Sequence, residues 1–125
     1  MILGIEHTGV SAQDPTALVR WYEKHLGMKI IRQIGDSIYF IMAENGAILE
    51  VYPAAQTAQA YPNNASGIRH LAILVKDIEA EQKKMLENGV DIDRDVPAPG
   101  ETRLIFLRDC EGNILHLVER AAPLG

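Results

Sequence analysis

Apolar and polar residues alternate along this chain in two successive patterns, and each pattern predicts a strand, a helix and three further strands. Residues 4–10 form a short alternating stretch that is typical of a strand. Asp14 and Pro15 make a favoured helix start, because aspartate caps the first turn and proline fits its first position. Gly27 stands where a left-handed helix stop is expected. Between these signals lies an apolar stripe at helical spacing: Leu18, Trp21, Tyr22 and Leu26.

The second pattern repeats the first one after 63 positions. Residues 67–73 match residues 4–10, so that His70 is equivalent to His7. A second helix follows, capped by Asp77 and ending near Gly89. The closing strands also match, with Glu50 equivalent to His116, although the second copy carries three more residues, which we expect in the loop 95–101.

The repeat predicts the organisation of the chain. We expect one domain over residues 1–125, built from a first module at 1–53, a linker at 54–66 and a second module at 67–120. The linker is rich in alanine, glutamine, proline and asparagine, which is typical of a connecting segment. Each module has the order βαβββ, and the fold class is therefore α+β.

Four strong metal-binding side chains occupy two pairs of equivalent positions in the repeat. His7 is paired with His70 in this way, and Glu50 with His116. If a pseudo-two-fold axis relates the copies, all four could point into one cleft. Imidazole and carboxylate suit zinc, nickel, iron(II), manganese or cobalt, so that one such divalent ion per site is the predicted cofactor. A single histidine in a strand is more often a hydrogen-bonded core residue, but four coincidences favour a metal site.

Two further residues are candidates for binding substrate. A four-residue turn in each hairpin predicts that Tyr39 lies opposite Glu50 and that Arg103 lies opposite Val118, on the face of the metal ligands. Arg103 could bind a carboxylate or phosphate, or could be a solvated strand end. Tyr39 could orient substrate through its hydroxyl or form the wall of the cleft.

Composition narrows the class of protein. The chain has 125 residues, 47% of them hydrophobic, and a net charge of −5, which disfavours nucleic acid as a partner. Its single cysteine, Cys110, excludes an internal disulfide and a cysteine-based metal cluster. Because no signal peptide and no long apolar run are visible, we expect a cytoplasmic protein without a membrane partner.

At the candidate metal ligands and in the segments around them, the sequence resembles the vicinal oxygen chelate superfamily, also called the glyoxalase / bleomycin resistance / extradiol dioxygenase group. The resemblance is carried by segments 5–10, 21–28, 49–50, 68–75 and 109–117. It implies paired βαβββ modules whose mixed sheets curl around a metal cleft. It also implies a homodimer and a small-molecule substrate bound through two adjacent oxygens. Whether one chain or two build the cleft stays open.

The ligand positions are most similar to those of glyoxalase I-like members, which typically have histidine or glutamine, glutamate, histidine and glutamate. His7, Glu50 and His70 agree, whereas His116 replaces the glutamate commonly assigned as the base. With one carboxylate, the ion and its ligands keep a formal charge of about +1. Glu50 is then the predicted catalytic base if the reaction is an isomerisation, and a bound hydroxide is the next candidate if Glu50 cannot detach from the ion.

The resemblance implies a metal-dependent lyase or isomerase of the glyoxalase type, acting on a small α-hydroxycarbonyl or thiohemiacetal. Two alternatives remain open. One is an extradiol-type iron dioxygenase, and the other is a non-enzymatic small-molecule binding protein of the antibiotic-resistance type.

Overall fold

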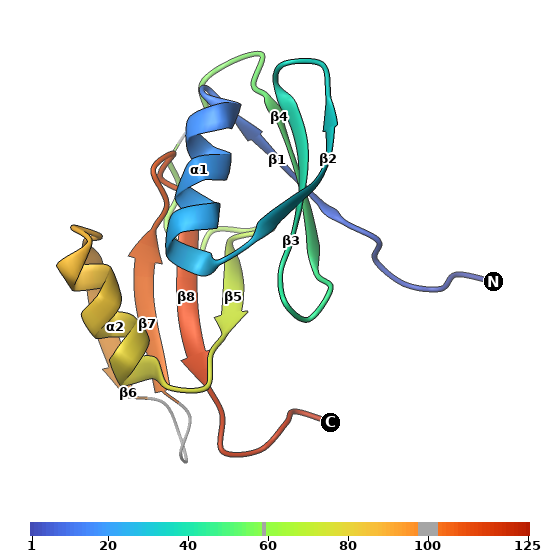
Figure 1. Cartoon of the computed structure of the whole chain (residues 1–125). Helices are drawn as coiled ribbons and strands as arrows, with labels where there is room; N and C mark the ends of the chain where they lie inside the picture. Colours follow the sequence, from blue (N-terminus) through green and yellow to red (C-terminus); the bar gives the residue numbers. More distant parts are fainter. Residues whose placement is uncertain (59, 98–102) are drawn as a thin grey trace. The chain divides into compact units, whose positions relative to one another are not determined.

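The chain divides into two units, Met1–Gln59 and Ala60–Gly125, each with one sheet and one helix. A computed structural model describes residues 1–58, 60–97 and 103–125 (Figure 1). The boundary between the units falls inside the segment that the sequence marks as a linker.

The first unit contains a four-stranded mixed sheet. Its strands lie in the order β1-β4-β3-β2; β1 and β4 run parallel, and the other neighbours run antiparallel. Helix α1 packs against β1, β3 and β4. The elements are β1 (Thr8–Ala12), α1 (Pro15–Leu26), β2 (Lys29–Ile34), β3 (Ile38–Met42) and β4 (Ile48–Pro53).

The second unit repeats this plan. Its sheet has the order β5-β8-β7-β6, again with one parallel pair, β5 and β8, and α2 packs against β7 and β8 (Figure 1). The elements are β5 (His70–Leu74), α2 (Ile78–Glu87), β6 (Ile92–Pro97), β7 (Arg103–Arg108) and β8 (Ile114–Glu119). The predicted α+β fold of two βαβββ modules is therefore confirmed.

Local chemistry explains why both helices begin where the sequence predicts. The side chains of Asp14 and Asp77 each accept a hydrogen bond of 3.0 Å, from the backbone N–H groups of Ala17 and Ala80. These bonds satisfy donors that the first helical turn leaves unpaired. Helix α1 ends at Gly27, whose φ of 67° is the left-handed conformation that glycine adopts without strain.

The register of both hairpins differs by one residue from the prediction. Glu50 lies opposite Phe40, not Tyr39, and His116 lies opposite Phe106. The cause is a three-residue turn, because the Ala43 N–H donates to the Ala47 carbonyl and so adds a pair at the end of the hairpin. Glycine with positive φ, 90° at Gly46 and 89° at Gly112, closes each turn.

A shift of one residue moves each side chain of a strand to the opposite face of the sheet. In β3 and β4, the side chains on the α1 side are buried: Tyr39, Ile41, Leu49 and Val51. In β7 and β8, the helix side holds Ile105, Leu107, Leu115 and Leu117, which are also buried. Phe40 and Glu50, and likewise Phe106 and His116, therefore share the face turned away from the helix.

The first strand is shorter than predicted. Pairing of β1 with β4 begins at Thr8, opposite Leu49, so that His7 lies immediately before the strand, whereas His70 begins β5. Strand β6 extends to Pro97, and the rest of the expected three-residue insertion lies outside the described residues. In the described part of the chain, no helix is both long and apolar enough to cross a membrane.

Candidate metal centre

In the first unit, the fold brings His7 and Glu50 together. The Nε2 atom of His7 lies 3.8 Å from the Oε1 atom of Glu50, and their side chains are 34% and 29% exposed. Glu50 lies in β4 opposite Gly9, two residues after His7, so the β1–β4 pairing sets this approach. The ring of Phe40 stands edge-on to His7, with 5.7 Å between the centroids. The first unit therefore offers one imidazole and one partly solvated carboxylate.

In the second unit, the equivalent positions bring His70 and His116 together. Their ring centroids are 4.7 Å apart, and Phe106 packs against both rings, at 6.4 Å from His70 and 5.1 Å from His116. His70 is exposed, whereas His116 is only 6% exposed. The second unit therefore offers two imidazoles, one of them buried.

Burial gives His116 its electrostatic character. Loss of solvent lowers the pKa of His116 below its ordinary value of 6.5, and the neighbouring His70 lowers this pKa further. The neutral imidazole is therefore favoured, which is the form that binds metal ions. The Nδ1 atom of His116 is buried and finds no hydrogen-bond partner among the described residues.

His7 and His70, the other two histidines among the candidate ligands, each have a side-chain oxygen close to Nδ1. For His7, this oxygen is Oε1 of Glu6, at 3.0 Å. For His70, it is Oδ1 of Asn63, at 2.9 Å. The sequence reasoning missed both partners, since Glu6 has Arg69 as its counterpart in the repeat and Asn63 lies in the expected linker.

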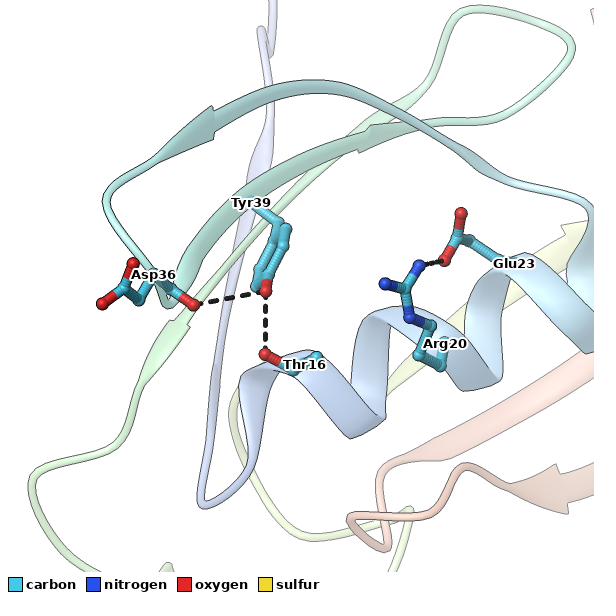
Figure 2. A network of polar contacts seen from close by, with 5 residues as sticks. All are labelled: Thr16, Arg20, Glu23, Asp36 and Tyr39. Carbon is cyan, nitrogen blue, oxygen red and sulfur yellow. Dashed lines mark hydrogen bonds and ion pairs between the residues drawn. The ribbon is translucent and has the colours of Figure 1, made fainter.

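Tyr39 lies on the opposite face of the sheet from Glu50. Its hydroxyl shares a 2.8 Å hydrogen bond with the hydroxyl of Thr16 in α1 and donates to the Asp36 carbonyl at 3.2 Å (Figure 2). The predicted pairing of Tyr39 with Glu50 is wrong, because the turn holds three residues and Tyr39 faces Val51. The reason for placing Tyr39 beside the metal ligands no longer holds, and its hydroxyl fastens β3 to α1.

Arg103 also lies on the helix side of its sheet. It pairs with Glu119, not with Val118 as predicted, and its guanidinium forms an ion pair of 2.9 Å with Glu79 of α2. The carboxylate of Glu119 accepts a hydrogen bond from the Ile78 N–H at 3.2 Å, at the start of α2. The ion pair with Glu79 accounts for the position of the Arg103 guanidinium, and no substrate anion is needed to explain it.

Two aromatic residues flank the candidate ligands and were not predicted. Phe40 and Phe106 occupy equivalent positions, each directly across the strand pair from Glu50 or His116. Phe40 and Phe106 are also equivalent in the sequence repeat. The predicted four-residue turns, however, place both rings on the sheet face opposite to Glu50 and His116. Each ring therefore gives its pair of donors an apolar neighbour.

The donor set fits a divalent cation. Three imidazoles and one carboxylate are ligands that first-row metal ions accept, and the buried Nδ1 of His116 is a polar atom whose hydrogen bonding the described residues leave unsatisfied. Each unit, taken by itself, holds two of these donors. Across residues 1–58, 60–97 and 103–125, histidine, cysteine, aspartate and glutamate side chains do not gather in a group of three or more that could hold an ion.

Comparison with known proteins agrees with this architecture. The model of the Glyoxalase/Bleomycin resistance protein/Dioxygenase superfamily matches residues 4–117. The uncharacterized protein YwbC of Bacillus subtilis (strain 168) is 29% identical over 126 residues, which cover 93% of this chain and 97% of that protein. The chain belongs to this superfamily, whose model spans nearly all of both units.

Solved structures show the same fold at lower identity. Lactoylglutathione lyase from Agrobacterium tumefaciens is 17% identical, with a TM-score of 0.74 and coverage of 94% of each chain. An E126Q mutant of the fosfomycin resistance protein FosX from Listeria monocytogenes is 19% identical. Its TM-score is 0.79, and the match covers 99% of this chain and 94% of that one. That structure is a complex with Mn(II) and 1S,2S-dihydroxypropylphosphonic acid.

Proposed function

We propose that this chain is a divalent-metal-dependent lyase or isomerase of the glyoxalase type, acting on a small α-hydroxycarbonyl or thiohemiacetal. One observation carries the proposal. Equivalent positions of the two units hold a His7–Glu50 pair and a His70–His116 pair, each beside a phenylalanine on the face turned away from the helix. The repeat accounts for the agreement of the places, and the presence of metal-binding side chains at all four of them supports the proposal.

The four side chains would hold one cation, with one pair from each unit, within one chain or across a homodimer. When bound, the cation would supply a Lewis acid for two adjacent substrate oxygens. Manganese in the FosX complex supports a divalent ion for this fold, while zinc, nickel, iron and cobalt suit the same donors. With a single carboxylate the site would keep a formal charge of about +1, which favours an anionic oxygen.

Glu50 would be the residue that moves a proton. Its carboxylate is 29% exposed and lies 3.8 Å from His7, so that it is held at the site while water can still reach it. Glu50 would also be a ligand of the cation, and the three imidazoles would keep the cation in place while Glu50 takes part in the proton transfer. Because the lone pair of His116 would be used to bind the cation, we do not assign it the proton transfer. A general base within reach of a carbon acid contributes roughly 100-fold or more to the rate.

The first experiment measures the metal and the reaction together. We would purify the full chain without an affinity resin that carries nickel, determine bound metals by mass spectrometry, and assay a panel of thiohemiacetals and α-hydroxycarbonyls. Redox-inert zinc or nickel with isomerase turnover supports the proposal. Tightly held iron(II) with oxygen uptake would favour the extradiol-type dioxygenase. Absence of bound metal after incubation with each candidate ion would favour a non-enzymatic binding protein.

The second experiment tests Glu50 directly. We expect Glu50→Gln to lower turnover by at least about 100-fold, because the amide cannot accept the proton. Glu44→Gln is the matched control, since Glu44 is exposed in the neighbouring turn. Unchanged turnover in Glu50→Gln would remove Glu50 as the base.

A further inference from the structure

We propose that Asn63 is a positioning residue for His70. Its side-chain oxygen holds His70 in the tautomer that carries the proton on Nδ1, and the lone pair of Nε2 is then available for a cation. The proposal about the tautomer of His70 is independent of the proposed function. The expected effect of this tautomer on metal affinity rests on the proposed function.

The contact between the two side chains sets the direction of the hydrogen bond. Oδ1 of Asn63 lies 2.9 Å from Nδ1 of His70. An amide oxygen can accept a hydrogen bond but cannot donate one, so Nδ1 of His70 must be the donor. In a neutral imidazole the other nitrogen then carries the lone pair. Metal-binding histidines commonly have an acceptor at the second nitrogen, which fixes the ring and its tautomer.

The first unit reaches the same arrangement with a different residue. Nδ1 of His7 lies 3.0 Å from Oε1 of Glu6, and an ionised carboxylate is likewise only an acceptor. The counterpart of Glu6 in the second unit is Arg69, whose guanidinium has donors and no acceptor. The neighbour of His70 therefore cannot do what the neighbour of His7 does. An acceptor for His70 has to come from elsewhere in the chain, and Asn63 supplies it.

Arg69 takes part in holding the segment that carries Asn63. Its guanidinium carbon lies 5.5 Å from the centre of the Tyr61 ring, a cation–π distance. The same segment is closed by a turn, in which the Ala65 N–H donates to the Pro62 carbonyl at 3.0 Å. Contacts before and after Asn63 thus bring its amide to His70. The segment that the sequence marks as a linker is, at this point, part of the site.

The tautomer can be measured on the metal-free full chain by ¹⁵N NMR of histidine-labelled protein above pH 8. We expect wild-type His70 to show a protonated Nδ1 and an unprotonated Nε2. Asn63→Ala should raise the share of the other tautomer at least several-fold, whereas Asn63→Asp, which keeps an acceptor, should preserve the wild-type pattern. Asn64→Ala is the matched control in the same exposed turn. Asn63→Leu, which keeps a similar size but has no acceptor, serves as a second variant with the same expected tautomer change if the alanine variant does not fold.

Metal affinity is measured in parallel by titration with Zn²⁺ alone against a chromophoric chelator. We expect Asn63→Ala to weaken binding about 10- to 100-fold, Asn63→Asp to restore it, and Asn64→Ala to leave it unchanged. A wild-type His70 with the proton on Nε2, or a tautomer unaffected by Asn63→Ala, would overturn the proposal. A tautomer change with unchanged zinc affinity would overturn its link to the metal. If His70→Ala binds zinc as tightly as the wild type, the proposed function fails while the tautomer result stands.

Discussion

The two units share a backbone plan but differ in the chemistry that they place on it. The same position in β4 and β8 holds Glu50 in the first unit and His116 in the second. Glu50 is partly solvated and can carry charge at little cost, whereas His116 is buried beside Phe106 and favours its neutral form. The comparison teaches that the backbone repeat fixes where a donor stands, and that local burial decides whether it brings a charge.

Exchanging the two donors should give the largest effect. We expect His116→Glu to lower the free energy of unfolding of the metal-free chain by roughly 3 kcal/mol, because an uncompensated carboxylate would occupy a buried position. Glu50→His, at a side chain 29% exposed, should cost less than about 1 kcal/mol. Urea unfolding in the presence of a chelator measures both. Equal losses would show that burial does not separate the two positions.

The second largest effect should be a dependence of stability on pH that arises from His116 in the second unit. The folded-state pKa of His116 is lowered, so between that value and 6.5 the unfolded chain binds a proton that the folded chain does not. The contribution of His116 to stability is therefore present above pH 6.5 and is lost as the pH falls through the folded-state pKa. Unfolding from pH 8 to pH 5 should show a smaller loss in His116→Gln than in the wild type. Parallel curves would contradict this.

The hydroxyl of Tyr39 should matter for stability and not for the site. Tyr39→Phe removes the hydrogen bond to Thr16 and should cost about 1 kcal/mol. The equivalent position in the second unit is Ile105, which has no hydroxyl. Tyr52→Phe, at an exposed residue, is the matched control and should change stability less. Lost turnover in Tyr39→Phe with unchanged stability would restore the substrate-binding role predicted from the sequence.

The ion pair between Arg103 and Glu79 should give the smallest effect. The Glu79 side chain is 79% exposed and the Arg103 side chain 36% exposed, and solvent-accessible pairs of this kind contribute less than about 1 kcal/mol. A double-mutant cycle with Arg103→Gln and Glu79→Gln measures the coupling. The KM for substrate should stay constant in both single variants, and a rise in KM in Arg103→Gln alone would return Arg103 to the site.

The sequence predicts the elements well because their signals are local. Asp14 with Pro15, and Asp77, mark helix starts that the structure confirms, and the repeat aligns the strands of both units. Alternation along β8 also places Glu119 on the face opposite to His116, and its carboxylate accepts a hydrogen bond from the Ile78 N–H at the start of α2. Such signals depend only on residues that are close in the sequence, so they can be recognised without knowledge of the three-dimensional structure.

Register and linker contacts were harder to predict. Alanine, glutamate, asparagine and glycine are compatible with turns of three or four residues, so the sequence around Gly46 does not fix the count, and Tyr39 went to the wrong face. Asn63 belongs to no repeat and no periodic pattern, and its contact spans seven residues of irregular chain. Whether the two pairs of donors share one ion stays a prediction.

The identical three-residue turns have a consequence for how such a chain can diversify. In both hairpins the side chains alternate in the same way. Every second residue packs on the helix side of the sheet, and the residues between them form an outer set on the other face. Substitutions at the partly exposed outer positions, such as Glu50, can alter ligand preference while the buried helix-side residues stay unchanged. An insertion or deletion of a single codon in either turn would interchange the two sets, so we expect evolution to tolerate replacements there far more readily than changes in length.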